Sequence, residues 1–99
     1  MTKQISEQTI LITGATDGLG KETARKLAAL GARLILHGRN KAKLQSVVSA
    51  LTAEFPDARV DTILADFSSL AQVRAMASEI NQRFDRLDIL VNNAGVMPS

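Results

Sequence analysis

Three glycines stand close together where a short apolar run meets a helical pattern. The run from Thr9 to Thr13 is rich in β-branched residues, and Gly14, Gly18 and Gly20 follow it in the spacing G-x-x-x-G-x-G. These glycines would allow a sharp turn off the strand, close approach of phosphate oxygens to bare backbone, and close packing of the next helix. The start of that helix directs N–H groups and a positive dipole end at an anion. The pattern predicts a turn that holds a dinucleotide pyrophosphate.

The residues between the glycines could act in the same way or only support the turn. Thr16, Asp17 and Leu19 are candidates for contacts with the phosphates. Thr16 and Asp17 could instead do no more than stabilise the turn. Alternatively, the glycines could form only a tight connection from strand to helix, with no ligand.

A basic residue follows the second apolar run, at a position that matters for the choice of dinucleotide. Arg39 lies 19 positions beyond Gly20, where an acidic residue would bind the ribose 2′-hydroxyl of NAD. The other candidates at this tip, none of them acidic, are His37, Gly38 and Asn40. Arginine binds a 2′-phosphate with two parallel hydrogen bonds, so the sequence favours NADP over NAD. Lys41 and Lys43 suit a nearby anion, although an ordinary solvated basic turn would also contain them.

The single histidine of the chain carries no clear sign of chemistry. His37 has no carboxylate or second histidine placed beside it by the sequence. We therefore interpret it as an exposed or internally satisfied residue at a strand end, and neither as a ligand nor as a base.

Four apolar runs alternate with three helical patterns, and the glycines and Arg39 lie at their junctions. The runs span residues 9–13, 33–37, 59–64 and 88–92. This alternation is typical of βαβ units and a parallel sheet. Right-handed crossovers give the strand order 3-2-1-4, with the ligand crevice between strands 1 and 4. We thus expect a doubly wound α/β fold of the Rossmann type.

Each helical pattern has an apolar face and end signals. The first helix, from about Leu19 to Leu30, ends at Gly31, and the second lies between an Asn40 cap and a Pro56 stop. Ser68 or Ser69 caps the third. The expected buried positions are Gly20, Ala24, Leu27, Ala28 and Gly31 in the first, Leu44, Val47, Val48, Leu51 and Phe55 in the second, and Leu70, Val73, Ala77, Ile80 and Phe84 in the third.

Two motifs at the ends of strands 1 and 4 carry a family resemblance. With Thr13-Gly-Ala-Thr-Asp-Gly-Leu-Gly20 and Asn92-Asn-Ala-Gly95, the chain resembles the short-chain dehydrogenase/reductase family along its whole length. The resemblance implies that Asp66 accepts a hydrogen bond from adenine and that the N–H of Phe67 contacts the ring. It also implies that Asn93, Ala94 and Gly95 line the cofactor ribose, while one asparagine ties strand 4 to its neighbours. Asp66 could instead cap a turn or helix, and the asparagines could form a turn without a ligand.

The same resemblance implies a reaction for which this chain lacks the central group. The family interconverts alcohols and carbonyls by hydride transfer, with a tyrosine, a lysine four residues later, a serine and an asparagine. The sequence contains no tyrosine, so we assign no catalytic residue. We expect residues 1–99 to be the N-terminal half of one NAD(P)-binding Rossmann domain, truncated after strand 4. The alternatives are a non-catalytic nucleotide-binding or sensor module, and a truncated fragment that self-associates through the apolar edge of strand 4.

Composition narrows the partners. The net charge is +2 and the only aromatic residues are three phenylalanines, which argues against nucleic-acid binding. The absence of cysteine excludes disulfides and thiolate metal sites. The polar N-terminus does not resemble a signal peptide, and no apolar run reaches the length of a membrane span. We expect a cytoplasmic protein, with a dinucleotide and a small alcohol or carbonyl substrate as its partners, that forms a homo-oligomer.

Overall fold

Four parallel strands form a single sheet. The computed structural model describes residues 4–93. The strands are β1 (Thr9–Ile12), β2 (Arg33–Gly38), β3 (Arg59–Leu64) and β4 (Ile89–Val91), in the order β3-β2-β1-β4. In this register Leu11 lies beside Ile35 on one side and Leu90 on the other. The predicted strand order is confirmed, and the strand ends differ from the predicted ones by no more than one residue.

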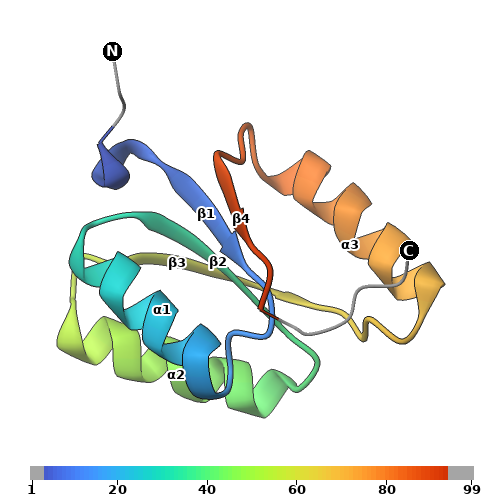
Figure 1. Ribbon diagram of the computed structural model, residues 1–99, viewed down its shortest axis with the longest axis horizontal. Coiled ribbons are helices and arrows are strands. Elements are labelled where there is room, and N and C mark those ends of the chain that lie inside the picture. The colour runs from blue at the N-terminus through green and yellow to red at the C-terminus, as the bar shows by residue number, and fades with distance from the viewer. Residues whose placement is uncertain (1–3, 94–99) are drawn as a thin grey trace.

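The helices are distributed over both faces of this sheet. A short 3-10 turn, η1 (Ile5–Glu7), precedes β1, and the helices are α1 (Gly18–Ala29), α2 (Lys41–Glu54) and α3 (Leu70–Arg83). Figure 1 shows α1 and α2 together on one side of the sheet and α3 on the other, which is the doubly wound arrangement. In the part of the chain that the structure describes, no helix is both long and apolar enough to cross a membrane. The cytoplasmic location stays a prediction.

Side-chain caps fix where α2 and α3 begin. The Asn40 side chain accepts a hydrogen bond of 3.0 Å from the N–H of Lys43, as the sequence predicts. At α3, Ser69 is the cap of the two candidates, because its hydroxyl accepts from the N–H of Gln72 at 3.3 Å. Such a cap stabilises a helix by about 1 kcal/mol relative to alanine.

Alternate residues of the strands enter two separate cores. Ile10, Ile12, Leu34 and Leu36 pack with the buried faces of α1 and α2. On the opposite face, a smaller cluster contains Leu11, Ile35, Ile63, Ala65, Met76 and Phe84. Because β1 and β2 are covered on both faces, their apolar runs are continuous rather than alternating.

Two expectations about buried helix faces are wrong in part. Gly31 is exposed, because it adopts a φ of 86° just beyond α1 and turns the chain away from the helix. In α3 the expected Leu70 and Ala77 are exposed, whereas Met76 is buried. Position 76 lies on the same helical face as Ile80, and the long thioether side chain of methionine reaches the sheet from there.

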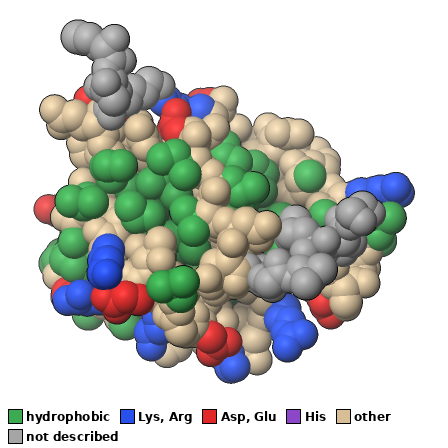
Figure 2. All heavy atoms as spheres, viewed as in Figure 1, with side chains coloured by type: hydrophobic (Ala, Val, Ile, Leu, Met, Phe, Trp, Pro, Cys, Tyr) green, Lys and Arg blue, Asp and Glu red, His purple; other side chains and the backbone are tan. Residues whose placement is uncertain are grey.

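The strand β4 carries exposed apolar side chains. Among residues 4–93 it pairs only with β1. Leu90 is 54% exposed and Leu87, just before the strand, is 40% exposed. Figure 2 shows hydrophobic side chains gathered on the face of the molecule that carries β1 and β4. An edge with this character favours association, and the self-association inferred from the sequence stays a prediction.

Candidate functional site

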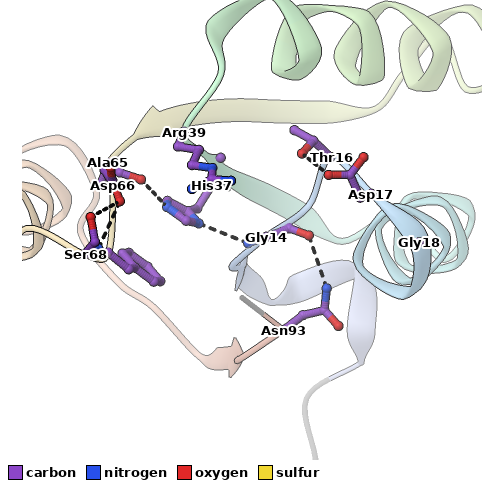
Figure 3. Close-up of a pocket in the computed structure, with 12 residues that line it drawn as sticks. Gly14, Thr16, Asp17, Gly18, His37, Arg39, Ala65, Asp66, Ser68 and Asn93 are labelled. Carbon is purple, nitrogen blue, oxygen red and sulfur yellow. Dashed lines mark hydrogen bonds between the residues drawn. The ribbon is translucent and has the colours of Figure 1, made fainter. Parts of the chain in front are cut away.

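A cleft of about 670 Å³ lies at the carboxyl ends of the strands. In open parallel sheets this is the edge where ligands bind. Figure 3 shows its walls, which come from the glycine-rich turn after β1 and from the ends of β2, β3 and β4. The lining residues are Gly14, Thr16, Asp17, Gly18, His37, Gly38, Arg39, Ala65, Asp66, Phe67, Ser68 and Asn93.

The structure brings most of the candidate residues from the sequence into this one cleft. The candidates that line it are Gly14, Thr16, Asp17, Gly18, Arg39, Asp66, Phe67 and Asn93. Leu19 and Gly20 do not line it: Leu19 is exposed and Gly20 is buried beneath the turn. Ala94 and Gly95 lie outside the described residues. The lining also contains Ala65 and Ser68, which the sequence does not indicate as binding residues, and His37 and Gly38, which it indicates only as neighbours of Arg39 at the strand tip.

Each glycine of the turn meets a different physical requirement. Gly14 and Gly18 have φ angles of 60° and 51°, a left-handed conformation that glycine adopts without strain. A side chain at Gly18 would meet no heavy atom within 4 Å, so the space beside it is open. At Gly20, by contrast, a Cβ atom would collide with the carbonyl oxygen of Gly14 and the amide nitrogen of Asn93. Gly20 therefore allows close contact between α1, the turn and the end of β4.

Polar groups after β4 hold the beginning of the turn. The backbone N–H of Asn93 donates to the hydroxyl of Thr13 at 2.8 Å, and its side-chain amide donates to the carbonyl of Gly14 at 3.1 Å. The Thr13 hydroxyl in turn lies 3.2 Å from the side-chain oxygen of Asn92. Both asparagines thus contribute to the link between β1 and β4.

His37 links the turn to the other side of the sheet. Its Nδ1 accepts a hydrogen bond of 3.0 Å from the N–H of Gly14, and its Nε2 lies 2.8 Å from the carbonyl oxygen of Ala65. The ring stacks on Phe67 with centroids 4.1 Å apart and is only 4% exposed. Burial lowers the pKa of His37, against a smaller opposing effect of the Ala65 carbonyl. The interpretation as a satisfied strand-end histidine agrees with these contacts, but the sequence does not predict the hydrogen bond with Gly14.

Asp66 forms a turn before α3 and faces a basic residue. Its Oδ1 accepts hydrogen bonds from the N–H of Ser68 at 2.9 Å and from the Ser68 hydroxyl at 2.8 Å. These bonds lower the pKa of Asp66, and the charge of Arg39 lowers it further by a smaller amount. The turn-forming role that the sequence left open is therefore present in the structure. It occupies Oδ1, and no hydrogen bond to Oδ2 occurs within residues 4–93.

The N-terminus of α1 differs from those of the other two helices. Asp17 is its N-cap residue, but the Asp17 side chain makes no capping hydrogen bond. Instead, one carboxylate oxygen lies 3.9 Å from Nζ of Lys43, and both side chains are well exposed. Within the described part of the chain, no side chain therefore caps the N–H groups of the first turn, at the point where the helix meets the cleft.

A parallel α/β sheet in the order 3-2-1-4, with a glycine-rich turn and a cleft at its carboxyl edge, defines a Rossmann-type domain. Residues 8–99 match the sequence model of the short chain dehydrogenases. The chain belongs to this family, whose members are oxidoreductases that bind a dinucleotide cofactor and a small-molecule substrate.

Named relatives agree with this assignment but are much longer. Levodione reductase of Leifsonia aquatica is 41% identical over 96% of this chain and 36% of its own length. An NADPH-bound short chain oxidoreductase from Pseudomonas aeruginosa PAO1 superposes with a TM-score of 0.84 at 34% identity, covering 96% of this chain and 37% of its own. A metagenomic short-chain oxidoreductase in complex with NADP superposes with a TM-score of 0.80 at 37% identity, covering 90% of this chain and 39% of its own. The chain therefore spans little more than a third of these proteins.

Proposed function

We propose that the cleft binds the adenosine and pyrophosphate part of a nicotinamide dinucleotide, with NADP preferred over NAD. The chain then serves as the cofactor-binding part of an oxidoreductase that interconverts an alcohol and a carbonyl. The observation that carries this proposal is the turn at Gly18, where open space adjoins an uncapped helix N-terminus. When bound, the nicotinamide would supply or accept the hydride. The residues of the cleft bind and orient the adenosine end of the dinucleotide.

The turn fits a pyrophosphate on steric and electrostatic grounds. Gly18 has no Cβ and leaves backbone accessible from the cleft. The first N–H groups of α1 provide hydrogen-bond donors and the positive end of the helix dipole. Asp17 does not compete for these donors, because its carboxylate is turned towards Lys43. Phosphate oxygens can therefore replace the missing cap.

The other end of the cleft fits an adenosine. Asp66 and Phe67 follow β3, and Arg39 follows β2, so an acceptor, an aromatic ring and a cation surround one region of the cleft. Oδ2 of Asp66, which accepts no hydrogen bond from residues 4–93, can accept from an exocyclic amino group. Arg39 is exposed and can bind a 2′-phosphate with two hydrogen bonds. The complexes of related proteins with NADPH and NADP support this choice of cofactor.

Exchange of the charge at Arg39 tests the cofactor preference. In the complete natural protein, Arg39→Asp should weaken NADP binding and improve NAD binding, because the aspartate repels a 2′-phosphate and accepts from a ribose hydroxyl. Loss of charge-assisted hydrogen bonds predicts a shift of about ten- to a hundredfold in the ratio of the two dissociation constants. Isothermal titration calorimetry with each dinucleotide measures this ratio.

A second variant controls for net charge. Lys26→Glu makes the same change in charge in the last turn of α1, at the end of that helix away from the cleft. It should leave the ratio between the two dinucleotides unchanged. If Arg39→Asp also leaves the ratio unchanged, the assignment of Arg39 is wrong. If the unaltered protein binds neither dinucleotide, the proposed function itself is wrong.

A further inference from the structure

His37 joins the ends of three strands at the glycine-rich turn. Its ring contacts the N–H of Gly14 after β1 and the carbonyl of Ala65 after β3, while its own backbone carbonyl accepts from the N–H of Ala15 at 2.9 Å. Figure 3 shows the ring between Gly14 and Ala65 at the base of the cleft. The first two residues of the turn are thus held by one residue of β2.

These two ring contacts determine the protonation state of His37. A backbone N–H can only donate, so Nδ1 must carry no proton where it meets Gly14. A carbonyl oxygen can only accept, so Nε2 must carry the proton where it meets Ala65. Both contacts exist together only in the neutral ring with its proton on Nε2.

A second proton would break the contact with the turn. It would attach to Nδ1 and point towards the N–H of Gly14, placing two donors at a separation of 3.0 Å. The ring has little space to move away, because it is buried and stacked on Phe67. The carbonyl of Gly14 is also bonded to Asn93, so relief of the clash must displace the peptide that begins the turn.

We infer that His37 is a positioning residue for dinucleotide binding: its neutral ring holds Gly14 in the ligand-binding shape, and protonation of the ring releases the turn. This inference rests on the proposed function, since it concerns the same cleft. The affinity for a dinucleotide then decreases as the pH falls, by about tenfold for each pH unit below the pKa of His37 in the ligand-free protein. Such a dependence couples cofactor loading to acidity.

Other charged groups also lie at the cleft wall. They are Arg39 after β2, Asp66 after β3 and Asp17 at the start of α1, with Lys43 of α2 beside Asp17. All of them remain in a variant that lacks only His37, so a pH dependence that they cause persists in that variant. A phosphate monoester titrates near pH 6, but only NADP contains one.

Two substitutions separate the two ring contacts. His37→Asn keeps an acceptor near the position of Nδ1, for the N–H of Gly14, and removes the donor to Ala65. His37→Gln keeps a donor near the position of Nε2, for Ala65, and removes the acceptor. Neither side chain can be protonated near neutral pH. We expect His37→Asn to bind at pH 8 within a few-fold of the unaltered protein and His37→Gln to bind about five- to tenfold more weakly.

The experiment is calorimetric titration of the complete natural protein with NAD and with NADP from pH 5 to pH 8, with circular dichroism at each pH to confirm that the protein stays folded. The unaltered protein should lose affinity for both ligands at low pH, and His37→Asn should show a flat profile with NAD. A flat NAD profile for the unaltered protein, or a sloping one for His37→Asn, would overturn the inference. Absence of binding at pH 8 would instead refute the proposed function.

One further measurement examines the ring of His37 directly in the unaltered protein. Nitrogen-15 NMR of the unaltered protein reports which ring nitrogen carries the proton. The signal of His37 is identified as the one that disappears in His37→Asn or His37→Gln. A proton on Nε2 alone at pH 8 agrees with the inference. A proton on Nδ1 at that pH would overturn it.

Discussion

Substitution of Gly20 by alanine tests whether close contact with the turn, rather than backbone freedom, requires glycine there. Gly20 lies in the first turn of α1, where an alanine would ordinarily be favoured. Its added methyl group would collide with the carbonyl oxygen of Gly14 and the amide nitrogen of Asn93. One obstacle is backbone and the other is a hydrogen-bonded side chain, so neither can move without loss.

The magnitude follows from three effects. Overpacking of a well-packed region costs about 1–3 kcal/mol. Displacement of the Asn93 amide from Gly14 removes one hydrogen bond, which is worth about 0.5–1.5 kcal/mol. Alanine recovers about 1 kcal/mol through its higher helix propensity. We therefore expect Gly20→Ala to lower the free energy of unfolding by about 0.5–3.5 kcal/mol.

Urea denaturation followed by circular dichroism measures this loss, and a double-mutant cycle identifies its cause. Asn93→Ala alone should destabilise the protein, because the carbonyl of Gly14 loses its partner. In the Gly20→Ala background the same change should cost less, since the amide has already been displaced. The reasoning would be refuted if Gly20→Ala were as stable as the unaltered protein, or if the two substitutions were strictly additive.

Three other substitutions test separate parts of the structure. The N–H of Thr9 donates to Asp88 at 2.8 Å and lowers the pKa of that carboxyl. The contribution of the Asp88 carboxylate to stability is present above pH 3.8 and is lost as the pH falls through the lowered pKa. Asp88→Asn should therefore flatten the acid side of a curve of unfolding free energy against pH. Asn40→Ala removes the cap on the N–H of Lys43 and should lower the free energy of unfolding in urea by about 1 kcal/mol. If the 99-residue chain produced alone self-associates through β4, then Leu90→Lys should lower the molar mass that light scattering measures. A monomeric unaltered chain would contradict self-association.

Local sequence signals were sufficient for the elements and their order. The apolar runs identify buried parallel strands, and the side chain of Asn40 marks the start of α2 as expected. The positive φ angles of Gly14 and Gly18 agree with the turn that their spacing predicts. These features depend on neighbours within a few residues, or on the right-handedness of βαβ crossovers, which holds for nearly all such units.

The family resemblance implied a link from one asparagine to the neighbours of strand 4, but the partner atoms at the site could not be predicted, because they belong to residues far apart in the chain. The amide of Asn93 meets Gly14 across 79 positions, and His37 meets Gly14 across 23. No periodicity records such a pairing, because it arises only when strand ends meet at one edge of the sheet. The buried position of Met76 in place of Ala77 is a smaller error of the same origin. Helical spacing identifies the apolar face of a helix, but how much of that face is buried depends on the sheet residues that pack against it.

The two polar contacts of Gly14 have a common consequence for the site. Its N–H is bonded to His37 of β2 and its carbonyl to Asn93 after β4, so the peptide groups on both sides of this glycine are held from opposite neighbours of β1. Glycine would otherwise be free to leave its left-handed conformation, and a ligand would have to restore it at an entropic cost. The flanking strands therefore preorganise the turn before any ligand binds. Two side chains outside the glycine motif, those of His37 and Asn93, thus help to hold the turn.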